Sequence, residues 1–355
     1  MPRLGVSTGI TGMLALFRSN LWVAAVSGPG WTKPHVGPDA SWVFPQPHAV
    51  MMHRTARGWQ RTPLPDGVTA ATDLTASAPD NIWAVAEDQS NKLLHWDGRR
   101  WHLIAPQKQN LSLLGLAVVG SDDVWAVGAG FTKTGSYAIV DHWDGHAWRL
   151  TRFPKMHVQL TAAAASASDD VFAFGGFWQY PDHRDSGNYD RSGYVILRWN
   201  GRSWRVSAAR VYHDTKTAFN FQSAVMLSRH DGWAVGALHP NYSGGPLQLF
   251  AHWNGHAWRF DRTPQCCRQL IVSSVSAAGP DRVWAAGYGG ANERTRTLAF
   301  RWDGRRWRPV GTPTGGYAAT IEAVTALPDG TAIIAGTTPN SNSTEYPLLQ
   351  RFISR

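Results

Sequence analysis

The sequence predicts an all-β fold, a seven-bladed β-propeller built from four-stranded antiparallel blades. Two observations support this: a motif with two tryptophans five residues apart recurs along the 355-residue chain, and a second motif precedes each copy. The repeat period of roughly 42 to 61 residues lies in the range typical of propeller blades. No segment shows the 3.6-residue apolar periodicity of an amphipathic helix.

The downstream motif contains an Asp-Gly or Asn-Gly pair between its two tryptophans. Such pairs favour tight turns between antiparallel strands, so we place the motif at the turn between the third and fourth strands of a blade. A degenerate copy, HRTARGW (53–59), keeps the Gly and the second Trp, and the final LLQRFISR keeps only the first half. The complete copies are HWDGRRW (95–101), HWDGHAW (142–148), RWNGRSW (198–204), HWNGHAW (252–258) and RWDGRRW (301–307).

The upstream motif combines an acidic turn with a short apolar strand. In the third period, apolar strands are expected at 113–119, after the turn at 121–123, at 136–143 and at 146–150, which gives four strands. The copies are GPDASWVF (37–44), APDNIWAVA (78–86), SDDVWAVG (121–128), SDDVFAFG (168–175), RHDGWAVG (229–236), GPDRVWAAG (279–287) and LPDGTAIIAG (327–336).

We assign structural roles to the repeated residues, since a site would not need seven copies. The outer-strand tryptophans Trp101, Trp148, Trp204, Trp258 and Trp307 are expected to pack between blades, and Trp96, Trp143, Trp199, Trp253 and Trp302 to end third strands. Asp123, Asp170, Asp231 and Asp281 are expected to accept backbone N–H bonds in the turn before the second strand. His142 and His252 belong to different blades, so the motif is not a metal site.

The two ends of the chain are expected to close the ring together. The last blade has only three predicted strands (321–327, 331–336 and 346–352), so residues 20–28 are predicted to supply its outer strand. An alternative aligns Trp22 with the upstream motif, SNLWVA against DNIWAVA. Residues 1–18 are interpreted as a lead segment, disordered or a signal remnant, and residues 19–355 as a single propeller.

Composition argues against several classes of function. The net charge of +9 is spread along the chain without a basic arm or helix, so no nucleic-acid partner is expected. The apolar N-terminal runs are interrupted by Arg18 and are too short to span a bilayer, so no transmembrane segment is expected. Cys266 and Cys267 are adjacent, which rules out a disulfide framework. We expect a monomer without metal or cofactor.

With these motifs, the chain resembles the bacterial kelch-like, galactose-oxidase-type β-propeller proteins that carry tandem DxWAVG…HWDGxxW units. The resemblance covers about 20–353 and implies the propeller fold and an extracellular location. Galactose-oxidase chemistry, which the resemblance associates with a Cys-Tyr crosslink and copper, does not fit a vicinal cysteine pair. The Asp-Gly-x-x-Trp turn is similar to the Asp-box of sialidases, but its spacing differs, so sialidase activity is not transferred.

Function is expected where the repeats differ, in loops on the face opposite the conserved turns. These loops are 175–193, 237–246, 287–297 and 336–347, with the linkers 209–220 and 261–269. Aromatic rings with nearby polar groups suit a sugar or a peptide. The candidate ligand-binding residues in these segments are Trp178, Tyr180, His183, Tyr189, Tyr212, His213, Asp214, His239, Tyr242, Tyr288, Glu293 and Arg294.

The leading hypothesis is a non-enzymatic binding module that presents this variable face to a carbohydrate or peptide. One alternative is a polysaccharide hydrolase or lyase that uses His183, His213 or His239 as general acid or base. A second alternative is a scaffold for protein partners. The structural alternative for the candidate residues is that they only cover the loop face and pack against one another.

Overall fold

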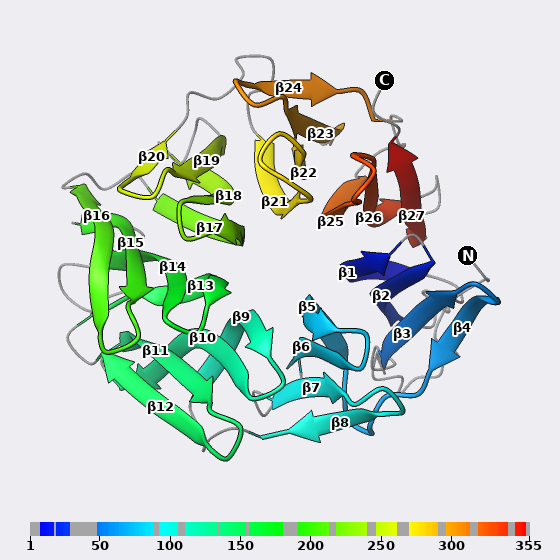
Figure 1. Ribbon diagram of the computed structural model, residues 1–355, viewed down its shortest axis with the longest axis horizontal. Coiled ribbons are helices and arrows are strands. Elements are labelled where there is room, and N and C mark those ends of the chain that lie inside the picture. Colours follow the sequence, from blue (N-terminus) through cyan, green and yellow to red (C-terminus); the bar gives the residue numbers. More distant parts are fainter. Residues whose placement is uncertain are drawn as a thin grey trace, which may run out of the picture.

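The computed structural model is a ring of seven antiparallel sheets around a central axis, as predicted (Figure 1). It describes residues 8–17, 19–28, 48–87, 92–105, 111–133, 135–153, 156–179, 191–212, 218–239, 246–260, 270–289, 296–312, 319–339 and 345–352. These residues form 27 strands and no helix. The chain is therefore a seven-bladed β-propeller.

Within each blade the strands follow one another from the centre of the ring outwards, each paired antiparallel with the next. The innermost strands are β1 (Thr8–Phe17), β5 (Ala70–Ala78), β9 (Leu111–Gly120), β13 (Gln159–Ala167), β17 (Ala218–Ser228), β21 (Leu270–Ala277) and β25 (Thr320–Ala326). The second strands are β2 (Asn20–Ser27), β6 (Asn81–Glu87), β10 (Asp123–Thr132), β14 (Asp170–Gln179), β18 (Asp231–His239), β22 (Val283–Gly289) and β26 (Ala332–Pro339).

The third and fourth strands form the outer part of the ring. The third strands are β3 (His48–Thr55), β7 (Lys92–Trp96), β11 (Gly135–Trp143), β15 (Arg191–Trp199), β19 (Leu247–Trp253), β23 (Arg296–Trp302) and β27 (Glu345–Phe352). The outer strands are β4 (Gly58–Thr62), β8 (Trp101–Ile104), β12 (Trp148–Phe153), β16 (Trp204–Tyr212), β20 (Trp258–Phe260) and β24 (Trp307–Val310). Among the described residues, the seventh sheet has the three strands β25, β26 and β27.

The predicted closure of the ring by residues 20–28 is wrong. Strand β2 pairs with β1 and β3, so it is the second strand of the first blade and not an outer strand of the seventh. The physical reason is the side-chain pattern: Asn20 bonds His53, and Trp22 stacks on that His, just as Asn81 and Trp83 do with His95. The alternative alignment of SNLWVA with DNIWAVA was the correct one, and the GPDASWVF segment lies outside the described residues.

The lead segment proposed for residues 1–18 is also wrong for Thr8–Phe17. These residues form β1, the innermost strand of the first blade, which is covered by neighbouring blades on both sides. Ile10 and Met13 pack with Ala323 and Ala335 of the seventh blade, and the Ile10 backbone N–H donates to Thr337 Oγ1 at 3.1 Å. The ring therefore closes here through side-chain packing between the first and seventh blades.

The hydrophobic core of the described residues is divided into seven clusters, one at each junction between neighbouring blades. Tryptophans on second strands pack against outer tryptophans of the next blade. Trp125, for example, lies 5.6 Å from Trp204, and Trp233 lies 5.0 Å from Trp307, both measured between ring centroids. The predicted role of the outer-strand tryptophans in packing between blades is confirmed at these junctions.

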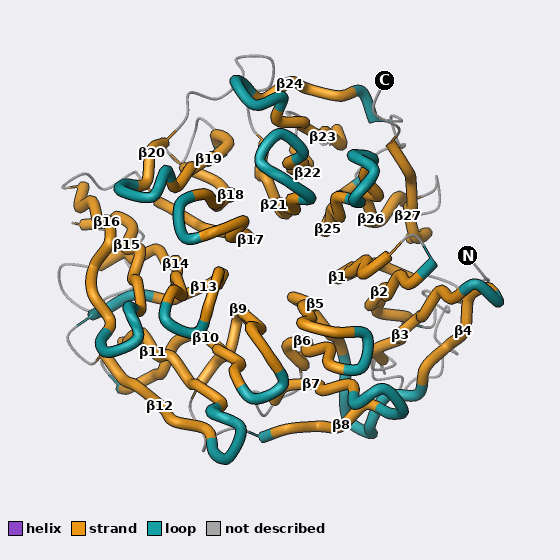
Figure 2. Tube along the Cα trace, in the orientation of Figure 1, coloured by secondary structure: helices purple, strands orange, loops and turns teal. Residues whose placement is uncertain are grey.

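The ring has two unlike faces. On the turn face, short turns join first to second strands and third to fourth strands (Figure 2). The two kinds of turn touch, since a Cβ at Gly145 would lie 2.6 Å from Cβ of Asp122. On the opposite face, here called the loop face, second strands lead to third strands and each blade leads to the next. Most residues of those connections lie outside the described part of the chain.

Candidate ligand site in the central cavity

The HWDGHAW motif forms a structural unit that is repeated on separate blades. Trp125 stacks on His142 with ring centroids 3.7 Å apart, and His142 Nε2 lies 2.9 Å from Asp123 Oδ1. Trp233, His252 and Asp231 repeat the arrangement two blades later, with the hydrogen bond at 2.8 Å. The histidine and the carboxylate therefore hold the tryptophan in place at the blade junction, and no two copies share a common centre.

Asp123, Asp170 and Asp231 do not act as predicted. Asp123 and Asp231 hydrogen-bond third-strand histidines. Asp170 pairs with Arg198, whose Nη2 lies 2.6 Å from Asp170 Oδ1. Asp281 is exposed and lies beside Arg282. Asp123, Asp170 and Asp231 thus link second strands to third strands through their side chains.

The Asp or Asn residues of the downstream motif cap the backbone of the turn between the third and fourth strands. Asp144 Oδ1 accepts the backbone N–H groups of His146 and Ala147 at 3.0 and 2.9 Å, and Asn254 Oδ1 makes the same bonds at 3.1 and 3.0 Å. The following glycines have φ near +85° to +89°, a conformation that favours glycine. Only one side-chain oxygen is needed here, which explains why Asp and Asn alternate in the motif.

The innermost strands differ from the outer strands in carrying a β-bulge in every blade. At each bulge the first strand has an extra residue opposite the second strand, near its third to fifth position. The bulged residues are Thr11, Asp73 with Leu74, Leu114, Thr161, Gln222, Ser273 and Glu322. Equivalent backbone positions in the seven blades therefore present side chains of several kinds around one axis.

The bulges also explain the final glycine of the WAVG motif. A Cβ at Gly236 would lie 1.9 Å from the Asn220 carbonyl oxygen, and one at Gly287 would lie 1.9 Å from that of Ile271. The bulge pushes the backbone of the innermost strand against the second strand, so the position has no space for a side chain. The glycine accompanies the bulge in five of the seven blades, and the first and second blades have Ala25 and Ala86 at the equivalent position.

The bulged residues line a cavity of about 660 Å³ along the axis of the ring. This volume lies within the range of small-ligand sites. The half nearer the loop face contains Asp73, Asn220, Gln222 and Glu322, whereas the half nearer the turn face is lined mainly by small or apolar residues such as Ala165, Met226 and Ala326. Among the described residues, no Lys, Arg or His lines the cavity. Its polar end therefore holds carboxyl groups without a basic side chain beside them in the described part of the chain.

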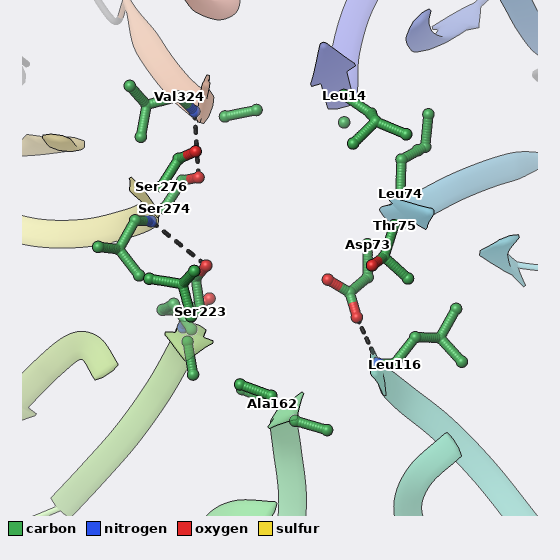
Figure 3. A pocket seen from close by; sticks show the side chains of 18 of the residues that line it. Leu14, Asp73, Leu74, Thr75, Leu116, Ala162, Ser223, Ser274, Ser276 and Val324 are labelled. Atoms are coloured by element: carbon green, nitrogen blue, oxygen red, sulfur yellow. Dashed lines mark hydrogen bonds between the residues drawn. The ribbon is translucent and has the colours of Figure 1, made fainter. Parts of the chain in front are cut away.

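Four of the bulged residues connect their blade to the next one. Thr11 Oγ1 donates to the Ala71 carbonyl at 2.6 Å, Thr161 Oγ1 donates to that of Phe221 at 2.6 Å, and Ser273 Oγ donates to that of Ile321. Asp73 Oδ2 instead accepts the Leu116 N–H at 2.5 Å (Figure 3). We call these four inter-blade bonds staples.

Further serines strengthen the same wall on the other side of the cavity (Figure 3). Ser223 Oγ accepts the Val275 N–H at 3.3 Å, and Ser274 Oγ accepts the Val324 N–H at 3.0 Å. In the part of the chain that the structure describes, hydrogen bonds thus join five of the seven pairs of neighbouring innermost strands, and small polar side chains of the wall make them. Leu114 and Gln222 have no such bond among the described residues and project into the cavity.

The carboxyl groups of the wall are perturbed. Burial raises the pKa of Asp73 to about 7, although the hydrogen bond from Leu116 acts in the opposite direction. The Asp73 residue is exposed to the cavity, which the innermost strands of the ring enclose laterally. Burial also raises the pKa of Glu322, against a hydrogen bond with Thr320. Titratable groups with such shifts in a cavity are candidates for function.

Of the residues predicted from the sequence, Tyr212, His239 and Tyr288 are described with their side chains. Trp178 is described only through its backbone, which pairs with Ser192 at the end of β14. The others lie outside the described residues: Tyr180, His183, Tyr189, His213, Asp214, Tyr242, Glu293 and Arg294. The loop histidines of the enzyme hypothesis are therefore represented here by His239 alone.

Tyr212 has a packing role. Its ring stacks on Phe219 of the next blade with centroids 5.2 Å apart, and the Arg210 guanidinium lies 4.8 Å from the centroid of the same ring. Tyr194 and Phe260 extend this aromatic group between the fourth and fifth blades. The structural alternative therefore accounts for Tyr212.

Tyr288 lies closer to the cavity. It is half-buried near the end of β22, and burial together with the nearby charge of Glu322 raises its pKa. His239, near the end of β18, is half-buried and has its pKa lowered by burial. Tyr212, His239 and Tyr288 belong to the fourth, fifth and sixth blades, at or near the ends of β16, β18 and β22. Tyr288 beside Glu322 is the predicted residue best connected with the cavity wall.

The acidic residues of the wall were missed by the sequence analysis, which looked for function only in loops. A usable signal was present: AATDLTASA (70–78) and TIEAVTA (320–326) each contain a carboxylate inside an otherwise uncharged strand. An acidic residue in an innermost strand needs a cavity or a partner, because burial of an isolated charge is unfavourable. Such interruptions therefore point to the axis of the ring.

No protein-family model and no curated protein sequence matches this chain. Solved propellers resemble it in fold. Ulvan lyase of family PL25, bound to -[GlcA(1-4)Rha3S]-, has a TM-score of 0.59 and 10% identity over 97% of this chain and 93% of its own. YCF48 bound to D1 peptide has a TM-score of 0.52 and 15% identity over 99% and 95%. The WD40 propeller domain of Doa1 has a TM-score of 0.52 and 12% identity over 98% and 94%.

At these identities the similarities show the propeller fold alone. The kelch-like, galactose-oxidase-type relationship stays a prediction. In the described part of the chain, no helix is long and apolar enough to cross a membrane. Among the same residues, no group of three or more His, Cys, Asp or Glu side chains is arranged to hold a metal ion.

Proposed function

We propose that this chain is a non-catalytic binding module that receives a segment of its ligand in the polar half of the central cavity, from the loop face. The observation that carries the proposal is the cavity of about 660 Å³, whose polar end is lined by carboxyl and amide groups on a rigid, stapled wall. Preorganised polar groups in a concave site fix the orientation of a ligand with little loss of entropy.

A peptide fits this wall better than an acidic polysaccharide does. Asp73 and Glu322 would repel the carboxylate or sulfate of an anionic sugar, and no basic side chain among the described residues lines the cavity to offset them. A peptide brings N–H donors and, in some sequences, positive charge. Of the structural neighbours, YCF48 is described as bound to a peptide and ulvan lyase as bound to an acidic saccharide, so both ligand classes belong in the test.

The test is a binding screen of the full chain against a peptide library and a glycan array. A Gln222→Trp variant should fill the cavity and weaken binding of the best peptide by at least about tenfold, because the bulky ring occupies the ligand position. Val206→Trp, on the exposed face of the outer strand β16, is the matched control and should bind as the wild type does.

Binding that Gln222→Trp leaves unchanged would contradict the cavity as the site. In that case a Trp178→Ala/Tyr180→Ala variant tests whether the ligand sits on the loops instead. Glycan binding without peptide binding would overturn the preference for a peptide. Turnover on a polysaccharide panel would favour the enzyme hypothesis.

A further inference from the structure

Asp73 differs from the other three staple residues because it carries a carboxylate where they carry a hydroxyl. Three of the four stapled bulges use a hydroxyl, at Thr11, Thr161 and Ser273, and a single oxygen atom makes each bond. Asp73 accepts the Leu116 N–H through Oδ2 alone, a role that the Ser223 and Ser274 hydroxyls fill at other blade junctions. A staple therefore requires one oxygen, whereas a carboxylate supplies two and adds a charge.

The second oxygen of Asp73 has no protein partner. Among the described residues, the bond from Leu116 N–H to Oδ2 is the one hydrogen bond of this side chain. Figure 3 shows the other oxygen directed toward the open centre of the cavity. Asp73 is also the single non-glycine residue in the described part of the chain with a positive φ, +48°, which is unfavourable for most side chains. The fold thus holds an acceptor in the cavity that its own contacts do not use.

Two further acceptors line the same half of the cavity. Glu322 occupies the bulge of β25, and Gln222 occupies that of β17, where its side chain has no hydrogen bond among the described residues. The wall therefore combines two carboxyl groups with an amide oxygen, and no Lys, Arg or His of the described residues compensates the charge. A positively charged hydrogen-bond donor is the complementary group.

The chemistry of the cation follows from the arrangement of the ring. Asp73 and Glu322 lie on innermost strands that are separated by β1, whereas a metal ion needs its oxygen ligands around one point. An organic cation can meet separate acceptors with its several N–H groups. The bulges lie about 10 Å along the innermost strands from the loop face, at about 3.3 Å per residue, so the cation must be small or carried on an extended arm.

We propose that the cavity binds a protonated amine or guanidinium, held by Asp73 Oδ1, Glu322 and the Gln222 amide, and that this group is the side chain of a Lys or Arg in a bound peptide. This inference rests on the proposed peptide-binding function and specifies its ligand. The charge of the side chain, inserted from the loop face, provides the specificity.

The test compares two peptides that differ in one charge. Acetyl-Gly-Gly-Arg-Gly-Gly-amide and its citrulline counterpart have nearly the same shape, and calorimetry measures the affinity of each for the full chain. The wild type should prefer the arginine peptide by at least about tenfold, as expected for charge-assisted hydrogen bonds. Free agmatine, a guanidinium without a peptide backbone, is the third probe.

The variants remove charge and keep shape. Asp73→Asn retains an oxygen for the Leu116 N–H, and Glu322→Gln leaves every staple intact, so it serves as the second variant if Asp73→Asn folds poorly. Each should reduce the preference for arginine, and the double variant should lose it. The matched control is Asp80→Asn, which removes a carboxylate from an exposed turn outside the cavity and should leave the preference unchanged.

The outcomes separate the two proposals. Equal binding of the arginine and citrulline peptides by the wild type would overturn the cation site and leave the binding module standing. Survival of the preference in the double variant would also overturn the cation site. No binding of any of the three probes, together with a negative peptide screen, would overturn both. Agmatine binding as tightly as the peptide would support the cation site and overturn the peptide source.

A pH series gives a further readout. The cation prefers ionised Asp73, whose pKa burial raises to about 7, so affinity for the arginine peptide should rise between pH 6 and pH 8. The flanking strands β1 and β9 contribute no titratable side chain to the cavity wall, and Glu322, with Tyr288 beside it, is the other ionisable group. Asp73→Asn should flatten this rise, and a rise that persists in the variant would contradict the role of Asp73.

Discussion

The second to fourth strands of each blade and its innermost strand solve different problems with the same repeated backbone. In the second and third strands, a tryptophan, a histidine or arginine, and an Asp or Asn recur at equivalent positions, as in Trp125, His142 and Asp123. In the innermost strands the backbone bulge recurs, but its side chain changes from Thr11 to Leu114 to Glu322. Repetition therefore marks stability, and variation at a constant backbone position marks the place where function can differ.

The difference has an energetic basis. Outer tryptophans are buried between blades, and the loss of such a ring affects the whole ring of sheets. Side chains at the bulges project into a cavity, where substitution changes chemistry with little loss of packing. Four bulges retain an inter-blade bond, so the wall stays rigid while Leu114, Gln222 and Glu322 are free of that requirement.

The largest expected effect is on the free energy of unfolding, which should differ between a scaffold substitution and a cavity substitution. Trp233→Ala should lower the free energy of unfolding by about 3–5 kcal/mol, because this fully buried ring packs against Trp302 and Trp307 of the next blade. Gln222→Ala, in the cavity wall, should change it by no more than about 0.5 kcal/mol. Urea unfolding of both variants measures the difference, and comparable losses would contradict the division between scaffold and site.

The next effect concerns Gly287, a second-strand glycine that lies against the backbone of the innermost strand. Gly287→Ala should cost about 3 kcal/mol, the upper end for overpacking, since its Cβ would lie 1.9 Å from the backbone oxygen of Ile271. Gly120→Ala is the matched control, because a Cβ there meets nothing within 4 Å. Thermal unfolding of both tests whether the bulge requires this glycine; tolerance of Gly287→Ala would show that the innermost strand can shift.

The smallest expected effect concerns a third-strand position at which one blade has a carboxylate and other blades have leucine. Asp141 is fully buried in β11, where the equivalent residues are Leu94 and Leu197, and neither of its oxygens makes a hydrogen bond of normal geometry. Burial raises its pKa to about 6, and the His142 backbone N–H and the charge of Arg152 offset only part of this. Asp141→Leu should therefore stabilise the protein by about 1–2 kcal/mol at pH 7.

The pH dependence of this effect has a defined sign. The folded protein holds the Asp141 proton more tightly than the unfolded chain, so stability falls as pH rises from about 4 to about 6. The gain from Asp141→Leu should consequently shrink at pH 4 and be complete at pH 7. Unfolding midpoints at the two values measure it, and a gain independent of pH would assign the effect to packing alone.

Much of the fold could be predicted because repetition at a fixed period reveals the unit that repeats. The Asp-Gly and Asn-Gly turns located the third and fourth strands, and the tryptophan spacing indicated packing between blades. The assignment of residues 20–28 failed because spacing was weighed above side-chain pattern: Asn20 and Trp22 reproduce the contacts of Asn81 and Trp83. Equal spacing does not distinguish a second strand from an outer strand, whereas these contacts do.

The candidate site was less accessible to sequence reasoning. Variable loops drew attention to Tyr212, which the structure places in aromatic packing with Phe219, and to Tyr288, which lies near Glu322. Asp73 and Glu322 are about 250 residues apart in the chain, at roughly the sum of five blade periods, and no local pattern links them. Their common position on one cavity wall depends on how the ring closes.

The sequence by itself determined the class of fold, the number of blades and the structural role of HWDGHAW, because each follows from local turn chemistry and from a repeat that a stacked sheet must bury. Only the tertiary structure decided which strand the N-terminal residues form, that every innermost strand carries a bulge, and which side chains face the axis. These features depend on contacts between blades. At the junction of the first and seventh blades, such contacts join residues from opposite ends of the chain.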